Sequence, residues 1–98
     1  MMGTQDSRSV QVKICGDVHG KAFRLWTEKN AEMLGLAGWV RNRCDGSVEA
    51  MFSGPKDVVD EMISRCNEGP PGAKVDEVNV LREECGQFSD EFDVLPTA

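Results

Sequence analysis

A short stretch of this sequence combines the residue types that bind phosphate-like anions, and it reads Gly16-Asp17-Val18-His19-Gly20-Lys21-Ala22-Phe23-Arg24. It links an alternating apolar segment to a helical one. Such junctions direct several backbone N–H groups at one point, and the helix N-terminus adds a partial positive charge. Glycine lets the backbone approach a ligand closely, and the planar fork of Arg24 can hold a phosphoryl group by two parallel hydrogen bonds. The stretch is therefore a candidate oxyanion cradle.

The same residues leave a plainer interpretation open. A simple β-to-α connection ending in an exposed arginine would look alike, and the GxxxxGK[ST] spacing of a Walker loop is absent. Lys21 could add an ammonium group to the cradle or be an ordinary solvated lysine. His19, the only histidine, could respond to pH or simply lie exposed. Asn42 precedes a hairpin signal, where asparagine is common for turn reasons.

Two segments of the first half must position these residues. Alternation of Val10, Val12 and Ile14 with polar neighbours predicts a strand before the stretch. A helix is predicted over 22–34, and Gly35 is suited to end it. Strands are predicted over 36–43 and 47–52, joined through the hairpin signal Asp45-Gly46.

The second half repeats the helix–strand order. Gly54-Pro55 predicts the start of a second helix, with proline in its first turn, and its apolar stripe is Val58, Val59, Met62, Ile63 and Cys66. A fourth strand is marked by valines that do not alternate strictly, which leaves room for a bulge: Val75, Val78 and Val80. Phe92 and Val94 predict a short final strand. The order β-α-β-β-α-β predicts an α+β, ferredoxin-like sandwich, an antiparallel sheet with two helices on one face.

The length and net charge of the chain restrict the domain organisation and the classes of partner that it can have. The 98 residues suit one domain, which we expect over 9–98 after a flexible tail at 1–8. A net charge of −6 argues against nucleic-acid binding, so an anionic substrate must be captured locally. No apolar run is long enough to span a membrane, and no secretory signal is apparent at the start. We therefore expect a cytoplasmic protein.

The cysteines indicate reduced thiols rather than a metal site. Cys15, Cys44, Cys66 and Cys85 form no CxxC pair. Without a secretory signal, the default is four free thiols, although the sequence does not exclude one disulfide. Only Cys15 lies near the candidate loop, and nothing else in the sequence activates it as a nucleophile.

Longer motifs resemble the acylphosphatase family over residues 10–94. They are Gly16-x-Val18-x-Gly20-x-x-Phe23-Arg24, Gly35-Leu36-x-Gly38-Trp39-Val40-Arg41-Asn42, Asp45-Gly46-Ser47-Val48-Glu49, Gly54-Pro55 and Gly69-Pro70-Pro71-Gly72-Ala73-x-Val75. The resemblance implies hydrolysis of the carboxyl–phosphate bond of acyl phosphates without a metal or cofactor. It places Arg24 on the family's phosphate-binding arginine, Asn42 on its water-orienting asparagine, and residues 16–23 on its phosphate-binding loop. His19, Lys21 and Arg43 depart from the family's usual glutamine, valine and threonine, which bears on loop geometry and affinity rather than on the reaction.

The implied chemistry needs few groups. A leaving carboxylate has a conjugate acid with a pKa of about 4, so its departure requires no general acid. An amide is a poor base, so we infer that a phosphoryl oxygen of the substrate takes the proton of the water held by Asn42.

The expected partner is a small acyl phosphate, with no nucleic acid and no membrane, and a monomer is expected. Two other classes stay in view. One is a binding module that holds an acyl or carbamoyl phosphate-like anion without turnover. The other is RNA recognition, which needs exposed aromatic residues and a basic face. Two tryptophans, four phenylalanines and the acidic charge disfavour it.

Overall fold

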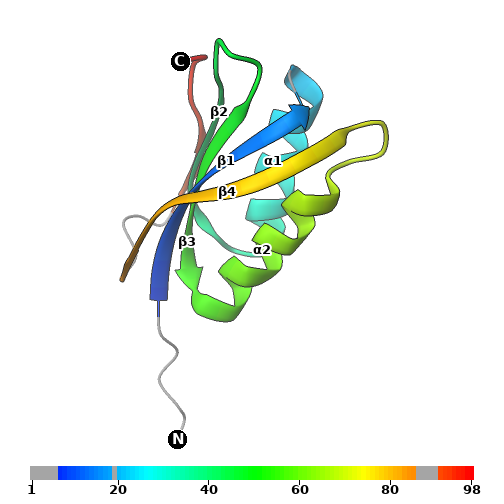
Figure 1. Cartoon of the computed structure of the whole chain (residues 1–98). Helices are drawn as coiled ribbons and strands as arrows, with labels where there is room; N and C mark the ends of the chain where they lie inside the picture. The colour runs from blue at the N-terminus through cyan, green and yellow to red at the C-terminus, as the bar shows by residue number, and fades with distance from the viewer. Residues whose placement is uncertain (1–6, 19, 86–90) are drawn as a thin grey trace, which may run out of the picture.

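The fold is a layer of two helices against one sheet (Figure 1). The computed structural model describes residues 7–18, 20–85 and 91–98. Its elements are β1 (Ser7–Asp17), α1 (Lys21–Met33), β2 (Ala37–Asn42), β3 (Val48–Pro55), α2 (Lys56–Glu68), β4 (Lys74–Cys85) and β5 (Phe92–Val94). The strand order is β4-β1-β3-β2-β5, and both helices pack on the same face. The predicted ferredoxin-like α+β sandwich is confirmed.

The sheet is mixed rather than wholly antiparallel. The first four strands pair antiparallel, but β5 lies parallel to β2 with Gly38 opposite Phe92 and Val40 opposite Val94. The strand order explains this difference. Strand β4 runs antiparallel to β1, whereas β2 runs in the same direction as β1. Because β5 runs opposite to β4, it is parallel to β2 when it joins the sheet at that edge.

The bulge for which the sequence left room is present in β4. The pairing of β1 with β4 shifts register between Gln11 and Val12 and again between Cys15 and Gly16. These shifts pass over Leu81 and Asp76 of β4. Bulges of this kind bend an edge strand and discourage pairing with another chain.

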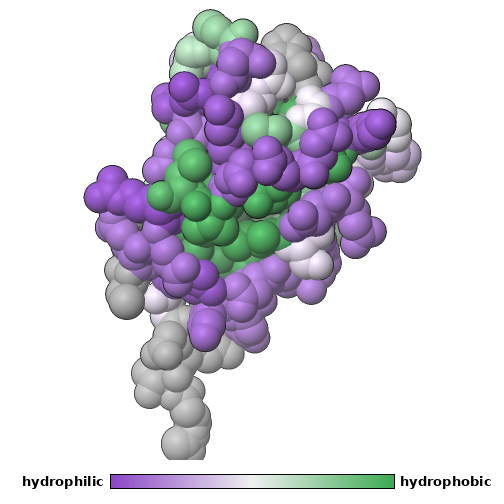
Figure 2. All heavy atoms as spheres, viewed as in Figure 1, coloured by the Kyte–Doolittle hydropathy of each residue, from purple (hydrophilic) through white to green (hydrophobic). Residues whose placement is uncertain are grey.

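Figure 2 shows an apolar patch on the face of the molecule that is also seen in Figure 1. Two side chains of β4, Val80 and Leu81, are each 52% exposed.

Two predicted boundaries are corrected. The strand β1 begins at Ser7, so Ser7 and Arg8 belong to the sheet rather than to a flexible tail. Arg8 is held there by ion pairs of 2.8 Å to Asp60 and of 2.8 Å to Glu83. The rest of the expected tail lies outside the described residues. Helix α2 begins at Lys56, and Pro55 is its N-cap rather than a residue of its first turn, because β3 continues through Pro55.

The core fills the space between the helices and the facing side of the sheet. Alternate residues of β1, β2 and β3 point into it, and the fully buried examples are Val10, Val12, Ile14, Val40, Val48, Ala50 and Phe52. From α2 come Val59, Met62 and Cys66. Burial raises the pKa of the Cys66 thiol to about 12, so this cysteine is an inert core residue.

Three of the cysteines have free thiols, as predicted: Cys15, Cys44 and Cys66. The side chain of Cys85 lies outside the described residues. Within the described ranges, no helix has the length and apolar character needed to cross a membrane. Among those residues, too, no group of three or more His, Cys, Asp or Glu side chains is placed to hold a metal ion.

Candidate active site

The candidate loop connects β1 to α1, as the sequence predicts. Asp17 ends β1, and its side chain is exposed. Val18 is 1% exposed and anchors the loop in the core. Gly20 is the N-cap of α1. His19 lies outside the described residues.

In the first turn of α1, Arg24 is the cation whose side chain is partly buried. Lys21 and Ala22 are exposed, whereas Phe23 is buried and packs against Trp26 with ring centroids 5.4 Å apart. Arg24 is half-buried. Val18 and Phe23 therefore offer only backbone groups to a ligand, while Arg24 can offer its side chain.

Gly16 brings β1 against β4 just before the loop. Its φ is +133°, a conformation that side chains with a Cβ rarely adopt. A Cβ at this position would overlap the carbonyl oxygen of Lys74 and lie 2.7 Å from the backbone nitrogen of Asp76. Only glycine fits here without moving β4. Gly20 also has a positive φ, +109°, but a Cβ there would meet no atom within 4 Å.

These two glycines give a matched prediction of stability. Gly20→Ala should lower the free energy of unfolding by about 1–2 kcal/mol, the cost of backbone strain alone. Gly16→Ala should lower it by more than about 3 kcal/mol, because strain and overlap with β4 add. Urea unfolding of the two variants and the wild type measures both values. Equal losses in the two variants would contradict the close approach of β4.

The N-terminus of α1 is open to an anion. Gly20 has no side chain to cap the helix, and the first turn contains no acidic residue. The unpaired N–H groups of a first turn carry partial positive charge, and they bind phosphate in many proteins. The first-turn N–H groups of α1 therefore have no side-chain cap and can donate hydrogen bonds to a ligand.

Asn42 joins β2 to this loop. It ends β2, is 6% exposed, and its Nδ2 donates a hydrogen bond of 3.3 Å to the carbonyl oxygen of Gly20. Its own carbonyl oxygen accepts a hydrogen bond of 2.9 Å from the backbone of Ala98. The structure therefore brings Asn42 to the loop that the sequence singled out, although the two lie 22 positions apart.

Arg24 and Asn42 each have one buried polar atom with no hydrogen-bond partner among the residues that the structure describes. The two atoms are Nε of Arg24 and Oδ1 of Asn42. An unpaired buried polar group costs about 1–3 kcal/mol, so such atoms point to a ligand or a functional role. Arg24 also forms no ion pair within the described ranges, unlike Arg8 and Arg43, whose Nε atoms are also buried without a hydrogen bond. The donor of Arg24 suits an anionic oxygen, and the acceptor of Asn42 suits the O–H of water.

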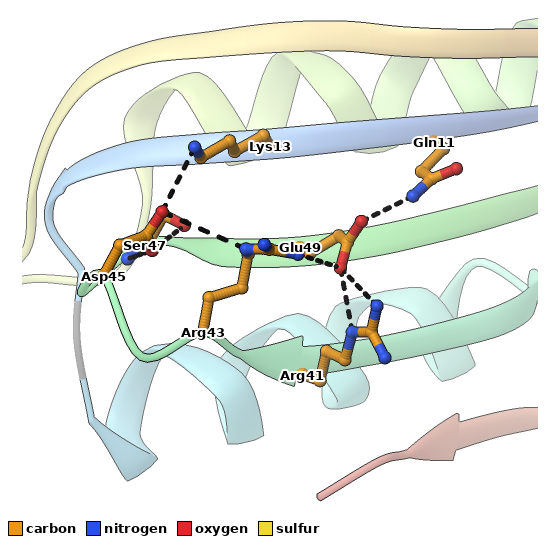
Figure 3. A network of polar contacts seen from close by, with 7 residues as sticks. All are labelled: Gln11, Lys13, Arg41, Arg43, Asp45, Ser47 and Glu49. Carbon is orange, nitrogen blue, oxygen red and sulfur yellow. Dashed lines mark hydrogen bonds and ion pairs between the residues drawn. The ribbon is translucent and has the colours of Figure 1, made fainter. Parts of the chain in front are cut away.

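A second polar cluster lies on the sheet face that the helices leave uncovered (Figure 3). Its centre is Glu49 of β3, 4% exposed, which accepts hydrogen bonds from Arg41, Arg43 and Gln11. Burial by itself would raise the pKa of Glu49, but these hydrogen bonds outweigh it and hold the pKa below its usual value. Sequence reasoning missed Glu49. The available signal was the polar residue between inward-facing Val48 and Ala50, opposite an arginine across the hairpin.

Comparison with known proteins identifies close relatives. The sequence profile of the acylphosphatase family matches residues 10–94. An acylphosphatase of Rhodopseudomonas palustris is 57% identical over 77 residues, covering 79% of this chain and 76% of the relative. An acylphosphatase of Bradyrhizobium diazoefficiens is 44% identical over 99 residues, covering 93% and 98%.

Solved structures agree with the sequence relatives. An acylphosphatase from Coxiella burnetii superposes with a TM-score of 0.82 at 33% identity, covering 96% of this chain and 100% of the other. One from Bacillus subtilis gives a TM-score of 0.83 at 29% identity, covering 90% and 98%.

Proposed function

This chain belongs to the acylphosphatase family, and from that membership we propose how its residues hydrolyse the carboxyl–phosphate bond of a small acyl phosphate. The proposal assigns phosphate binding to Arg24 and the loop over 16–23, and water positioning to Asn42. The observation that carries it is the pair of unpartnered buried atoms, Arg24 Nε and Asn42 Oδ1, at a loop to which Asn42 is bonded.

Arg24 and the start of α1 stabilise charge on the phosphoryl group. In phosphoryl transfer, negative charge is spread over the oxygens that do not react. Donors fixed in place before the reaction stabilise this charge without reorganising, and each can be worth about 10²–10³ in rate. The guanidinium of Arg24 supplies a full charge, and the N–H groups of the first turn supply partial charges. Together they bind the substrate and stabilise the transition state.

Asn42 positions the nucleophile. Its Nδ2 is held by Gly20, which fixes the side-chain amide and turns Oδ1 towards a remaining partner. A water that donates a hydrogen bond to Oδ1 is held beside the loop, in line with the bond that breaks. Orientation of this kind lowers the barrier by removing the entropy of bringing the reactants together.

Proton transfer needs no enzyme base in this scheme. Water attacks phosphorus, the P–O bond to the acyl group breaks with its electron pair, and a carboxylate leaves. The conjugate acid of that carboxylate has a pKa of about 4, so it departs unprotonated. The proton of the attacking water goes to a phosphoryl oxygen of the substrate, and the products are carboxylate and inorganic phosphate.

The assay of this mechanism is hydrolysis of acetyl phosphate by the purified chain with excess chelator. We expect activity that is unaffected by the chelator and a rate that shows no titration of an enzyme base near neutrality. Loss of activity restored by a divalent cation would contradict the metal-independent scheme. A base with a pKa between about 6 and 8 in the profile of kcat against pH would contradict substrate-assisted proton transfer.

We further propose that the enzyme is a single domain, which includes β1 from Ser7, and that it acts as a monomer in the cytoplasm. Free thiols at Cys15 and Cys44, the latter exposed, are typical of a reducing compartment and support this location. One core that contains side chains from both helices and from the sheet supports a single domain.

A further inference from the structure

The two neighbours of Asn42 in the chain bind the same carboxylate. Arg41 and Arg43 flank Asn42, and because side chains alternate along a strand they point to the opposite face of the sheet. Figure 3 shows both guanidinium groups converging on Glu49 of β3. The Asn42 side chain faces the loop, while the side chains of Arg41 and Arg43 bind Glu49 on the opposite face of the sheet.

The contacts to Glu49 are short and mostly made to one oxygen. Arg41 donates to Oε1 from Nε at 2.8 Å, and its Nη2 also lies 2.8 Å from this oxygen. Arg43 donates to the same oxygen from Nη1 at 3.1 Å. Gln11 of β1 donates to Oε2 at 2.5 Å. Three adjacent strands, or segments next to them, therefore meet at one carboxylate.

The cluster continues into the hairpin that follows Asn42. Lys13 of β1 lies 3.2 Å from a carboxylate oxygen of Asp45, and Ser47 donates to Asp45 from its hydroxyl at 2.6 Å and its backbone N–H at 2.9 Å. Arg43 lies 3.9 Å from Asp45. The end of β2 is thus bound on its outer face to both β1 and β3.

We propose that Glu49 is a positioning residue for Asn42: by holding Arg41 and Arg43 it fixes the backbone on both sides of Asn42, and so the direction of its amide. The inference rests on the proposed role of Asn42. Backbone hydrogen bonds from Arg43 to Ser47 and from Ala98 to Asn42 continue the pairing past the end of β2, and the contacts to Glu49 add side-chain restraints on the residues that flank Asn42. A displacement of about 1 Å in a group that orients a reactant can cost on the order of 10²-fold in rate.

The test is a double-mutant cycle on kcat with acetyl phosphate. Glu49→Gln keeps the shape of the side chain but removes the charge that holds both arginines. We expect kcat to fall about tenfold in the wild-type background. Inhibition by inorganic phosphate should stay within about twofold, because the phosphate site is untouched. In an Asn42→Ala background the same change should cause no further loss of kcat.

A matched control comes from the same strand and the same face. Ser53 of β3 is fully buried, and its hydroxyl lies 2.8 Å from that of Ser9, at the end of the sheet away from the loop. Ser53→Ala removes a buried polar contact without touching β2 beside Asn42. We expect unchanged kcat in this variant at a temperature where thermal melts show it folded.

The outcomes separate the two proposals. Full activity of Asn42→Ala would overturn the role of Asn42 itself. A reduced but measurable kcat of Asn42→Ala, combined with an equal effect of Glu49→Gln in both backgrounds, would overturn the positioning role alone. If Glu49→Gln does not fold, Arg43→Gln replaces it, since this side chain is 38% exposed. The replacement should lower kcat about threefold with the same dependence on Asn42, and an unchanged kcat would count against the inference.

Discussion

Arg24→Ala should reduce kcat/KM for acetyl phosphate by at least about 10³-fold. Loss of one neutral oxyanion donor costs about 10²–10³ in rate, and Arg24 supplies a full charge as well as two or more donors. Its half-buried position strengthens the interaction of this charge with an anion relative to the same interaction in water. Inorganic phosphate should cease to inhibit at the concentrations that inhibit the wild type. Steady-state kinetics with phosphate as a competitive inhibitor measure both effects.

The control for this variant keeps the charge and changes the shape. Arg24→Lys retains a cation but loses the planar fork, so we expect a loss intermediate between those of the wild type and the alanine variant. Arg24 makes no ion pair with any other described residue, and its removal should leave the thermal midpoint nearly unchanged. Activity of Arg24→Ala within about tenfold of the wild type would remove Arg24 from the proposed transition-state contacts.

Asn42→Ala should lower kcat by about 10²–10³-fold while the inhibition constant of phosphate changes little. The side chain of Asn42 is assigned to water, not to the phosphoryl group, so its loss removes an interaction of the transition state only. The fold should tolerate the change, because the bond from Nδ2 to Gly20 is long at 3.3 Å and contributes at most about 1 kcal/mol. Measurement of kcat and of phosphate inhibition on the folded variant tests the split.

Asn67→Ala is the matched control for this prediction. Asn67 of α2 also donates from Nδ2 to a backbone oxygen, that of Ile63, at 3.0 Å, but it is exposed and belongs to the second helix. We expect its kcat to equal that of the wild type. An Asn42→Ala variant that lost phosphate affinity in proportion to kcat would show that Asn42 binds the substrate rather than orienting water.

The fold followed from periodicity, and the failures have physical causes. Alternating valines and the two helical stripes were enough to predict a ferredoxin-like sandwich. The direction of β5 could not be read from Phe92 and Val94, because three residues carry no signal of which edge they join or in which direction they run. The start of β1 was missed because Ser7 and Arg8 are polar. Their place in the sheet depends on ion pairs from Arg8 to residues far along the chain.

The candidate site was predictable in part. The glycines and Arg24 indicated an anion cradle from residue types alone, but Asn42 resembled a turn residue until the family motif singled it out. Its contact with Gly20 depends on tertiary structure, which brings the end of β2 beside the start of α1. Glu49 was not recognised because a single acidic residue in a strand ordinarily faces solvent. Its burial follows only from the two arginines and the glutamine that surround it.

The open start of α1 has a thermodynamic consequence. Gly20 provides no side chain to cap the first-turn N–H groups of α1, so a bound phosphate would supply the hydrogen bonds that a serine or aspartate supplies at other helix starts. A bound phosphate, rather than a side chain, would then accept the hydrogen bonds of the first-turn N–H groups of α1. Folding and binding then share the same hydrogen bonds, and the native state gains stability as the phosphate concentration rises past its dissociation constant. The enzyme is most resistant to unfolding while it is occupied.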